Sequence, residues 1–181
     1  MKIFVAFLPL AVVGFIFRHE IKELFSVEIV AVMFIVGGLI SLLVEKFYDD
    51  KSHYKRRLED VGWREAVVIG LFQVFALIPG TSRAGSTIIG AMLSGLDRKT
   101  SAEFSFLLAL PVMLAASAYD ILSHWEEFGN QDIATLGAGF LTAFVTALLA
   151  MRLFIGFLER FTFVSFGIYR ILFGLLLLTL Y

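Results

Sequence analysis

The feature that most constrains the fold is a polar segment inside an apolar run, at residues 79–87. It reads Pro-Gly-Thr-Ser-Arg-Ala-Gly-Ser-Thr, so an arginine, two glycines and four hydroxyls lie close together. The flanking residues 66–72 and 88–93 are apolar, and each flank is too short to cross the hydrocarbon core, which needs about 20 residues. Pro79 also interrupts a helix. We therefore predict a re-entrant helical hairpin over residues 66–94, which enters the membrane, turns at mid-depth and returns.

The rest of the chain has the composition of an integral membrane protein. Apolar residues make up 59% of the 181 residues, against about 45–50% in soluble domains, and the mean hydropathy is +0.88. The apolar runs predict one all-α membrane domain over residues 1–181, with about five transmembrane helices besides the hairpin. The predicted spans are residues 1–17, 29–44, 103–119, 133–154 and 161–181. The net charge of −1 indicates no nucleic-acid partner, and a chain without cysteine has no disulfide or thiolate metal ligand.

The charges of the loops predict an orientation. Residues 45–65 and 96–101 carry lysine and arginine, which favours the cytoplasmic side for both. The segment between them must then enter and leave the membrane on the same side, as a hairpin does. Residues 120–132 contain no lysine or arginine and are predicted outside. Arg18 and Lys22 are the exception, because their loop also falls outside.

The predicted hairpin tip has the chemistry of an anion site. Gly80 allows the backbone to approach a ligand closely, and Thr81 or Ser82 is a natural N-cap for a helix that starts near Arg83 or Ala84. The N–H groups and the positive dipole end of that helix favour a phosphate. Arg83 adds a planar fork that can hold two phosphate oxygens, and Ser82 is also a candidate nucleophile. The further hydroxyl donors are Ser86 and Thr87.

Each polar residue near the hairpin also has a structural interpretation. The hydroxyls could satisfy backbone groups at the helix break, and Arg83 could snorkel or pair with Glu103. Glu103 could instead cap the first turn of its span or pair with Arg170. Gln73 could bind a ligand or form an interhelical hydrogen bond. Arg170, near the middle of the last span, could pair structurally or contact a substrate.

Groups for metal binding and for acid–base catalysis are scarce in this sequence. The histidines, His19, His53 and His124, fall in predicted loops without metal-ligand spacing. A phosphatase needs a general acid or base and usually a metal held by carboxylates. Glu103 is the one candidate for a buried carboxylate, so the residues alone leave the metal ligands unknown.

The chain resembles the membrane undecaprenyl-diphosphate phosphatases of the bacitracin-resistance type. The resemblance rests on residues 70–83, which read Gly-Leu-Phe-Gln-Val-Phe-Ala-Leu-Ile-Pro-Gly-Thr-Ser-Arg, on Ser101–Leu108 followed by Pro111, and on Ile168–Arg170. It implies removal of one phosphate from undecaprenyl diphosphate, which recycles the lipid carrier for peptidoglycan. It also implies a bacterial plasma-membrane location, a site that opens to the outer face, and dependence on Mg²⁺ or Ca²⁺.

The same resemblance implies that Arg83 binds the diphosphate and offsets charge in the transition state, that Ser82 and Thr87 hydrogen-bond phosphate oxygens, and that Gly80 and Thr81 shape the loop. Together with the residues themselves, it predicts Arg83 and Ser82 as catalytic, and Glu103 and Arg170 as supporting the site. The predicted substrate-binding residues are Gly80, Thr81, Ser86, Thr87 and Gln73.

The chain also departs from the pattern of this family. Ala84 stands where the family usually has serine. The family has two inverted repeats, each with a re-entrant hairpin, and its first hairpin carries paired glutamates and a histidine. This sequence shows only the second hairpin, so we expect it to contain one repeat and a fraction of the other. The chain alone is therefore expected to be nearly inactive, and to aggregate or form a homo-oligomer through its uncovered face. The alternatives left open are a polyprenyl-phosphate transporter or flippase, and a membrane protein that binds lipid diphosphate without hydrolysing it.

Overall fold

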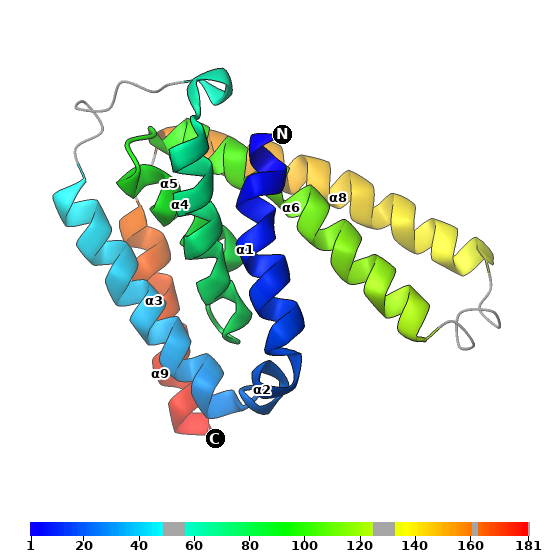
Figure 1. Ribbon diagram of the computed structural model, residues 1–181. Helices are drawn as coiled ribbons and strands as arrows, with labels where there is room; N and C mark the ends of the chain where they lie inside the picture. The colour runs from blue at the N-terminus through cyan, green and yellow to red at the C-terminus, as the bar shows by residue number, and fades with distance from the viewer. Residues whose placement is uncertain (49–56, 125–132, 161–162, 181) are drawn as a thin grey trace.

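The computed structural model describes residues 1–48, 57–124, 133–160 and 163–180, and within these residues every regular element is helical. The helices are α1 Lys2–Ile16, α2 Arg18–Glu23, α3 Val27–Phe47, α4 Trp63–Val74, α5 Arg83–Leu93, α6 Arg98–Ser123, α8 Ile133–Arg160 and α9 Phe163–Leu180, with the short 3-10 helices η2 Leu58–Asp60 and η3 Phe75–Leu77. Figure 1 shows the elements as a helical bundle from which one pair of helices, α6 and α8, points away.

The all-helical membrane class predicted from the sequence is confirmed. The segments long and apolar enough to span a bilayer are α3, α6, Ala134–Leu153 and α9, and α1 is a shorter apolar helix of 15 residues. Several helices extend beyond the predicted spans: α6 begins at Arg98 rather than at residue 103, and α8 ends at Arg160 rather than at 154. Apolar composition marks only the part of a helix that lies in hydrocarbon, whereas the helix itself continues into the interface. Residues 161, 162 and 181 of the last predicted span lie outside the described residues.

The closest helix packing joins α3 to α9, which run side by side in opposite directions (Figure 1). A methyl group built on Gly38 would lie 2.7 Å from the carbonyl oxygen of Gly167, and one built on Gly174 would lie 2.7 Å from that of Ala31. The small residues recur every seven positions on both helices, so the two backbones approach along a continuous seam. Such small-residue seams drive helix association in membranes, where burial of apolar surface gives little advantage over lipid.

We expect Gly38→Leu to destabilise the protein by about 1–3 kcal/mol, the usual cost of overpacking a close contact. The side chain would be forced into the Gly167 carbonyl and would separate α3 from α9. Thermal unfolding in detergent measures the effect. Gly139→Leu is the matched control, because nothing lies within 4 Å of a Cβ at Gly139 on α8. Equal melting temperatures for the two variants would contradict the seam.

The hairpin α4–α5 enters the bundle between the α3–α9 pair and α1 and ends part-way along it (Figure 1). Its outer side packs on α1 and α6 through a buried apolar cluster. On the other side, α5 packs on α9 and α6 through a second cluster, formed by Ile88, Met92, Ala102 and Phe163. The hairpin is therefore held on both sides, which is the condition for irregular backbone at membrane depth.

Contacts of Glu45 join three helices at one end of the bundle. Its carboxylate pairs with Arg98 of α6 and accepts a hydrogen bond of 3.1 Å from the backbone N–H of Phe163 at the start of α9. Tyr48 donates from its hydroxyl to the Leu96 carbonyl at 2.7 Å. We call this the Glu45 end, and the opposite end, which holds α2, the α2 end. Both ends of the hairpin lie at the Glu45 end, and α6 and α8 diverge from the bundle toward their far ends (Figure 1).

Candidate functional site

The tip of the hairpin is a tight turn set by its sequence. The chain leaves η3 in extended conformation at Ile78, the residue before Pro79, as the proline ring favours. Gly80 then takes φ +86°, in the left-handed region that glycine tolerates. A Cβ at Gly80 would also lie 2.5 Å from the Val30 carbonyl oxygen of α3. Both the backbone angle and the close approach therefore require glycine at this position.

Ser82 is the N-cap of α5. Its hydroxyl oxygen accepts a hydrogen bond from the Gly85 N–H at 3.1 Å. The N–H groups of a helix's first turn have no partner inside the helix. Because Ser82 satisfies only that of Gly85, the N–H groups of Arg83 and Ala84 are left for a ligand or water. The positive dipole end of α5 lies at the same place.

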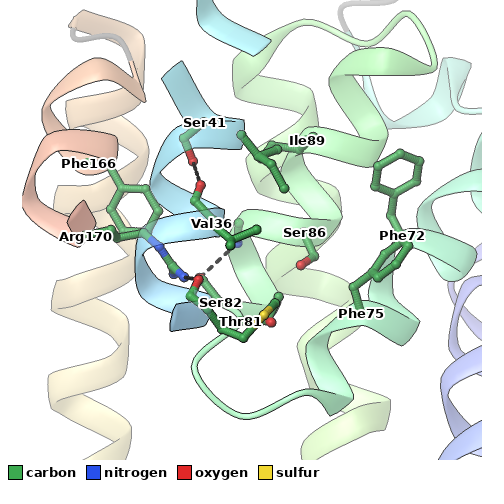
Figure 2. A pocket seen from close by; sticks show the side chains of 14 residues that line it. Val36, Ser41, Phe72, Phe75, Thr81, Ser82, Ser86, Ile89, Phe166 and Arg170 are labelled. Atoms are coloured by element: carbon green, nitrogen blue, oxygen red, sulfur yellow. Dashed lines mark hydrogen bonds between the residues drawn. The ribbon is translucent and has the colours of Figure 1, made fainter. Parts of the chain in front are cut away.

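A pocket of about 300 Å³ lies beside this tip (Figure 2). Its walls are mainly apolar and aromatic, and its polar side chains are one arginine and four hydroxyl groups. The lining residues are Met33, Val36, Gly37, Ile40, Ser41, Phe72, Phe75, Thr81, Ser82, Gly85, Ser86, Ile89, Phe166 and Arg170. The Thr81 hydroxyl oxygen is buried without a hydrogen-bond partner among the described residues. A buried hydroxyl of this kind is costly unless a ligand or water satisfies it.

Arg170 of α9 holds the tip in place. Its Nη2 donates to the carbonyl oxygens of Gly80 at 2.7 Å and Met33 at 2.9 Å, and its Nε donates to that of Phe34 at 3.4 Å. The guanidinium also lies over the rings of Phe34 and Phe166, at 4.8 and 5.6 Å from their centroids. Figure 2 shows it reaching from α9 toward the loop. Arg170 therefore fixes the tip against α3 and α9, and it also lines the pocket.

Arg83 lies on the other side of α5, toward α6. Its Nη1 donates to the Ser105 carbonyl oxygen at 3.1 Å, which uses one of the five N–H donors of the guanidinium. Thr87 is fully buried on this side, where its hydroxyl donates to the Arg83 carbonyl and lies 2.6 Å from the Ser105 hydroxyl. The structure thus brings Thr81, Ser82, Ser86 and Arg170 together at the pocket. Gly80 lies next to them through its bond to Arg170, and Arg83 and Thr87 lie behind them, toward α6.

The other two residues singled out in the sequence lie away from the pocket. Gln73 is fully buried against α1, where its Nε2 is 3.5 Å from the Ala6 carbonyl oxygen and its Oε1 has no partner within the described residues. Glu103 is not the cap of its helix, because Asp97 caps α6 through a 3.0 Å bond from the Thr100 N–H. Glu103 also forms no ion pair with Arg83 or Arg170 in the described part of the chain.

Comparison with known proteins gives the family. The model of the bacitracin resistance protein BacA family matches residues 1–176. The chain belongs to the BacA family. It is 59% identical over 181 residues to a protein named undecaprenyl-diphosphatase from Sulfurimonas denitrificans, with 98% of this chain and 70% of that protein covered. It is 56% identical to undecaprenyl-diphosphatase 2 of Pseudoalteromonas translucida and 52% identical to undecaprenyl-diphosphatase of Methanococcus aeolicus, covering 70% and 69% of those proteins and 99% and 98% of this chain.

The pocket of this BacA-family chain does not fit a divalent cation by its described residues alone. Mg²⁺ and Ca²⁺ prefer carboxylate oxygens, whereas the pocket lining contains no carboxylate and the Arg170 guanidinium would repel a cation. No three described His, Asp or Glu side chains form a group that could hold a metal. The requirement for Mg²⁺ or Ca²⁺ stays a prediction.

Two serines that lie at or behind the pocket were not predicted from the sequence. Ser41 lines the pocket and donates to the Gly37 carbonyl at 2.8 Å. Ser105 accepts a hydrogen bond from Arg83 at its backbone carbonyl, and its hydroxyl lies 2.6 Å from that of Thr87. Ser41 could have been found, since it is the one hydroxyl in the apolar run of residues 29–44. Ser105 contacts Arg83 through its backbone carbonyl, which side-chain identity does not predict.

Proposed function

We propose that this protein removes the terminal phosphate from undecaprenyl diphosphate and yields undecaprenyl phosphate and inorganic phosphate. In the cell this reaction recycles the lipid carrier for peptidoglycan and gives bacitracin resistance. The proposal is supported by membership of the BacA family and by relatives named undecaprenyl-diphosphatase. The names of these relatives favour a phosphatase over the flippase alternative.

The observation that carries the proposal is the unpartnered Thr81 hydroxyl in an apolar pocket beside the N-terminus of α5. A lipid phosphate needs hydrogen-bond donors for its head and an apolar surface for its chain. The hairpin tip offers the donors, and the walls formed by Phe72, Phe75 and Phe166 offer the apolar surface. Sites of about 300–1,000 Å³ with apolar walls and a few polar groups are typical of small-ligand binding.

In our proposal the diphosphate lies across the first turn of α5. The N–H groups of Arg83 and Ala84 and the hydroxyls of Thr81, Ser82 and Ser86 donate to its oxygens. Ser82 can do so while it caps α5, because a hydroxyl accepts and donates at the same time. Arg83 stabilises the charge that develops in the transition state from the α6 side, with the donors that Ser105 does not use. Arg170 positions the tip and keeps Gly80 in its place.

The test is lipid-diphosphate hydrolysis by membranes from a strain that carries the gene and from the same strain with the gene deleted. We expect gene-dependent release of inorganic phosphate and accumulation of undecaprenyl phosphate. Loss of this release with EDTA would support the predicted need for a divalent cation. Gene-dependent movement of the lipid across vesicle membranes without hydrolysis would instead favour the flippase.

We further propose that the protein lies in the bacterial plasma membrane, with the Glu45 end in the cytoplasm and the pocket opening to the outer face. The lysine and arginine content of the loops supports this orientation. A homo-oligomer also stays a prediction.

The orientation can be tested by cysteine labelling, because the natural chain contains no cysteine. Single cysteines replacing Glu59 and Lys99, both exposed at the Glu45 end, should react only from the cytoplasm. A cysteine replacing Glu23 at the α2 end should react only from outside. Labelling of positions 59 and 99 from opposite sides would mean that α4–α5 crosses the membrane, and the re-entrant hairpin would be wrong.

A further inference from the structure

A second groove lies on the other side of the hairpin, between α1, η3 and α6. Its volume is about 640 Å³, and it is separate from the pocket beside Ser82. The wall is apolar, and three basic side chains line it at the α2 end. The wall residues that matter here are Phe7, Leu10 and Gly14 of α1, Leu77 of η3, and Val112 and Ala115 of α6.

The three basic residues of the groove are Arg18, His19 and Lys22, which share one side of the short helix α2. The acidic residues of that helix, Glu20 and Glu23, do not line the groove. Arg18 lies over the Phe15 ring, 5.6 Å from its centroid, and its Nε is 3.4 Å from His19 Nε2. Neither Arg18 nor Lys22 pairs with a carboxylate in the part of the chain that the structure describes. Two unpaired cations therefore lie at the mouth of an apolar groove.

Arg18 and Lys22 are also the exceptions to the positive-inside rule in this chain. The positive-inside rule places lysine and arginine at the Glu45 end. Arg18 and Lys22 lie at the opposite end, the α2 end. A cation at that position needs a reason other than topology. The anionic headgroups of lipids attract lysine and arginine near the membrane surface, and an apolar groove beneath them suits an acyl chain.

We propose that this groove binds an anionic glycerophospholipid of the bilayer. The phosphate lies against Arg18 and Lys22, and one acyl chain lies along α1 and α6, past Leu77 and toward Phe7. A methyl group on Gly14 would lie 3.3 Å from a Leu77 methyl, so Leu77 of the hairpin lies close to α1 in this groove. In our proposal the acyl chain therefore contacts the side of the hairpin that faces away from the other pocket. Lipid binding in this groove does not depend on the phosphatase activity.

The test compares two lipids on the purified protein in detergent by native mass spectrometry. We expect phosphatidylglycerol to be retained at lower concentration than phosphatidylcholine with the same acyl chains. The double variant Arg18→Gln/Lys22→Gln should weaken phosphatidylglycerol binding by about thirtyfold, from the attraction of two cations. Arg64→Gln/Arg152→Gln is the matched control, because it removes two exposed cations elsewhere and should leave the binding unchanged.

A second variant tests the apolar wall. Ala115→Phe fills the groove and should remove the bound phosphatidylglycerol without changing any charge. A photoreactive phosphatidylglycerol should crosslink to peptides of α1 and α6 in the natural chain and not in this variant. Equal retention of the two lipids, or equal loss in the control double variant, would overturn the proposal. A dimer that Ala115→Phe dissociates, with no lipid held in the natural protein, would assign the groove to a second copy instead.

Discussion

Arg83→Ala is expected to lower the rate of phosphate release by about 100- to 1,000-fold, the usual effect of removing one group that stabilises transition-state charge. The guanidinium stands at the N-terminus of α5, where the helix dipole and the free N–H groups already favour an anion. Its bond to the Ser105 carbonyl uses one donor and orients the rest. Arg83→Lys keeps the charge but loses the planar fork, so it should still lose most of the activity. Both variants are made in the natural gene and assayed in membranes.

The bond to Ser105 gives Arg83 a possible structural role, which the melting temperature separates from catalysis. If Arg83 acts on the substrate, activity falls while the melting temperature stays close to that of the natural protein. Arg152→Ala is the control, since it removes an exposed arginine from α8 and should leave activity unchanged. A parallel loss of activity and stability would show that Arg83 only holds α5 on α6. Near-normal turnover of the alanine variant would remove Arg83 from the site.

The fold class and the position of the turn between α4 and α5 could be predicted because both depend on local sequence. An apolar run interrupted by Pro79, Gly80 and hydroxyls cannot continue as one helix through a membrane, so a turn follows from the residues themselves. The structure has a helix, a turn and a helix over Trp63–Leu93, with Ser82 as the cap. The helix ends were less predictable. Asp97 begins α6 before the apolar run does, because a cap is a local hydrogen bond and not a matter of hydropathy.

The partners of the polar side chains could not be predicted from the sequence. A membrane helix is apolar around most of its circumference, so periodicity does not show which face meets which neighbour. Arg170 is separated from Gly80 by 90 positions in the sequence, and only the rotation of α9 brings them together. The two sides of α5 could not be predicted either, because its polar residues are clustered in the first turns and point in more than one direction. The sequence places Ser82, Arg83, Ser86 and Thr87 in one segment, but the structure turns two toward the pocket and two toward α6.

The hairpin tip should be the position least tolerant of a single methyl group, and Gly80→Ala tests this. At φ +86° an alanine is strained by about 1–2 kcal/mol, and overpacking adds about 1–3 kcal/mol, because its Cβ would lie 2.5 Å from the Val30 carbonyl oxygen. To relieve the clash the tip must move away from α3, which breaks the 2.7 Å bond from Arg170 to the Gly80 carbonyl. We therefore expect a lower melting temperature and loss of most of the phosphate release.

Gly95→Ala is the matched control for Gly80→Ala, because it separates backbone strain from the steric clash. Gly95 has φ +96°, but nothing lies within 4 Å of a Cβ at that position. Its alanine variant should show only the strain, with a smaller fall in melting temperature and activity close to normal. Equal losses in the two variants would mean that the left-handed angle alone matters and that the contact with α3 is not needed. Full activity in Gly80→Ala would mean that the tip can move away from α3 without harm to the reaction, so Arg170 would not be the residue that positions it.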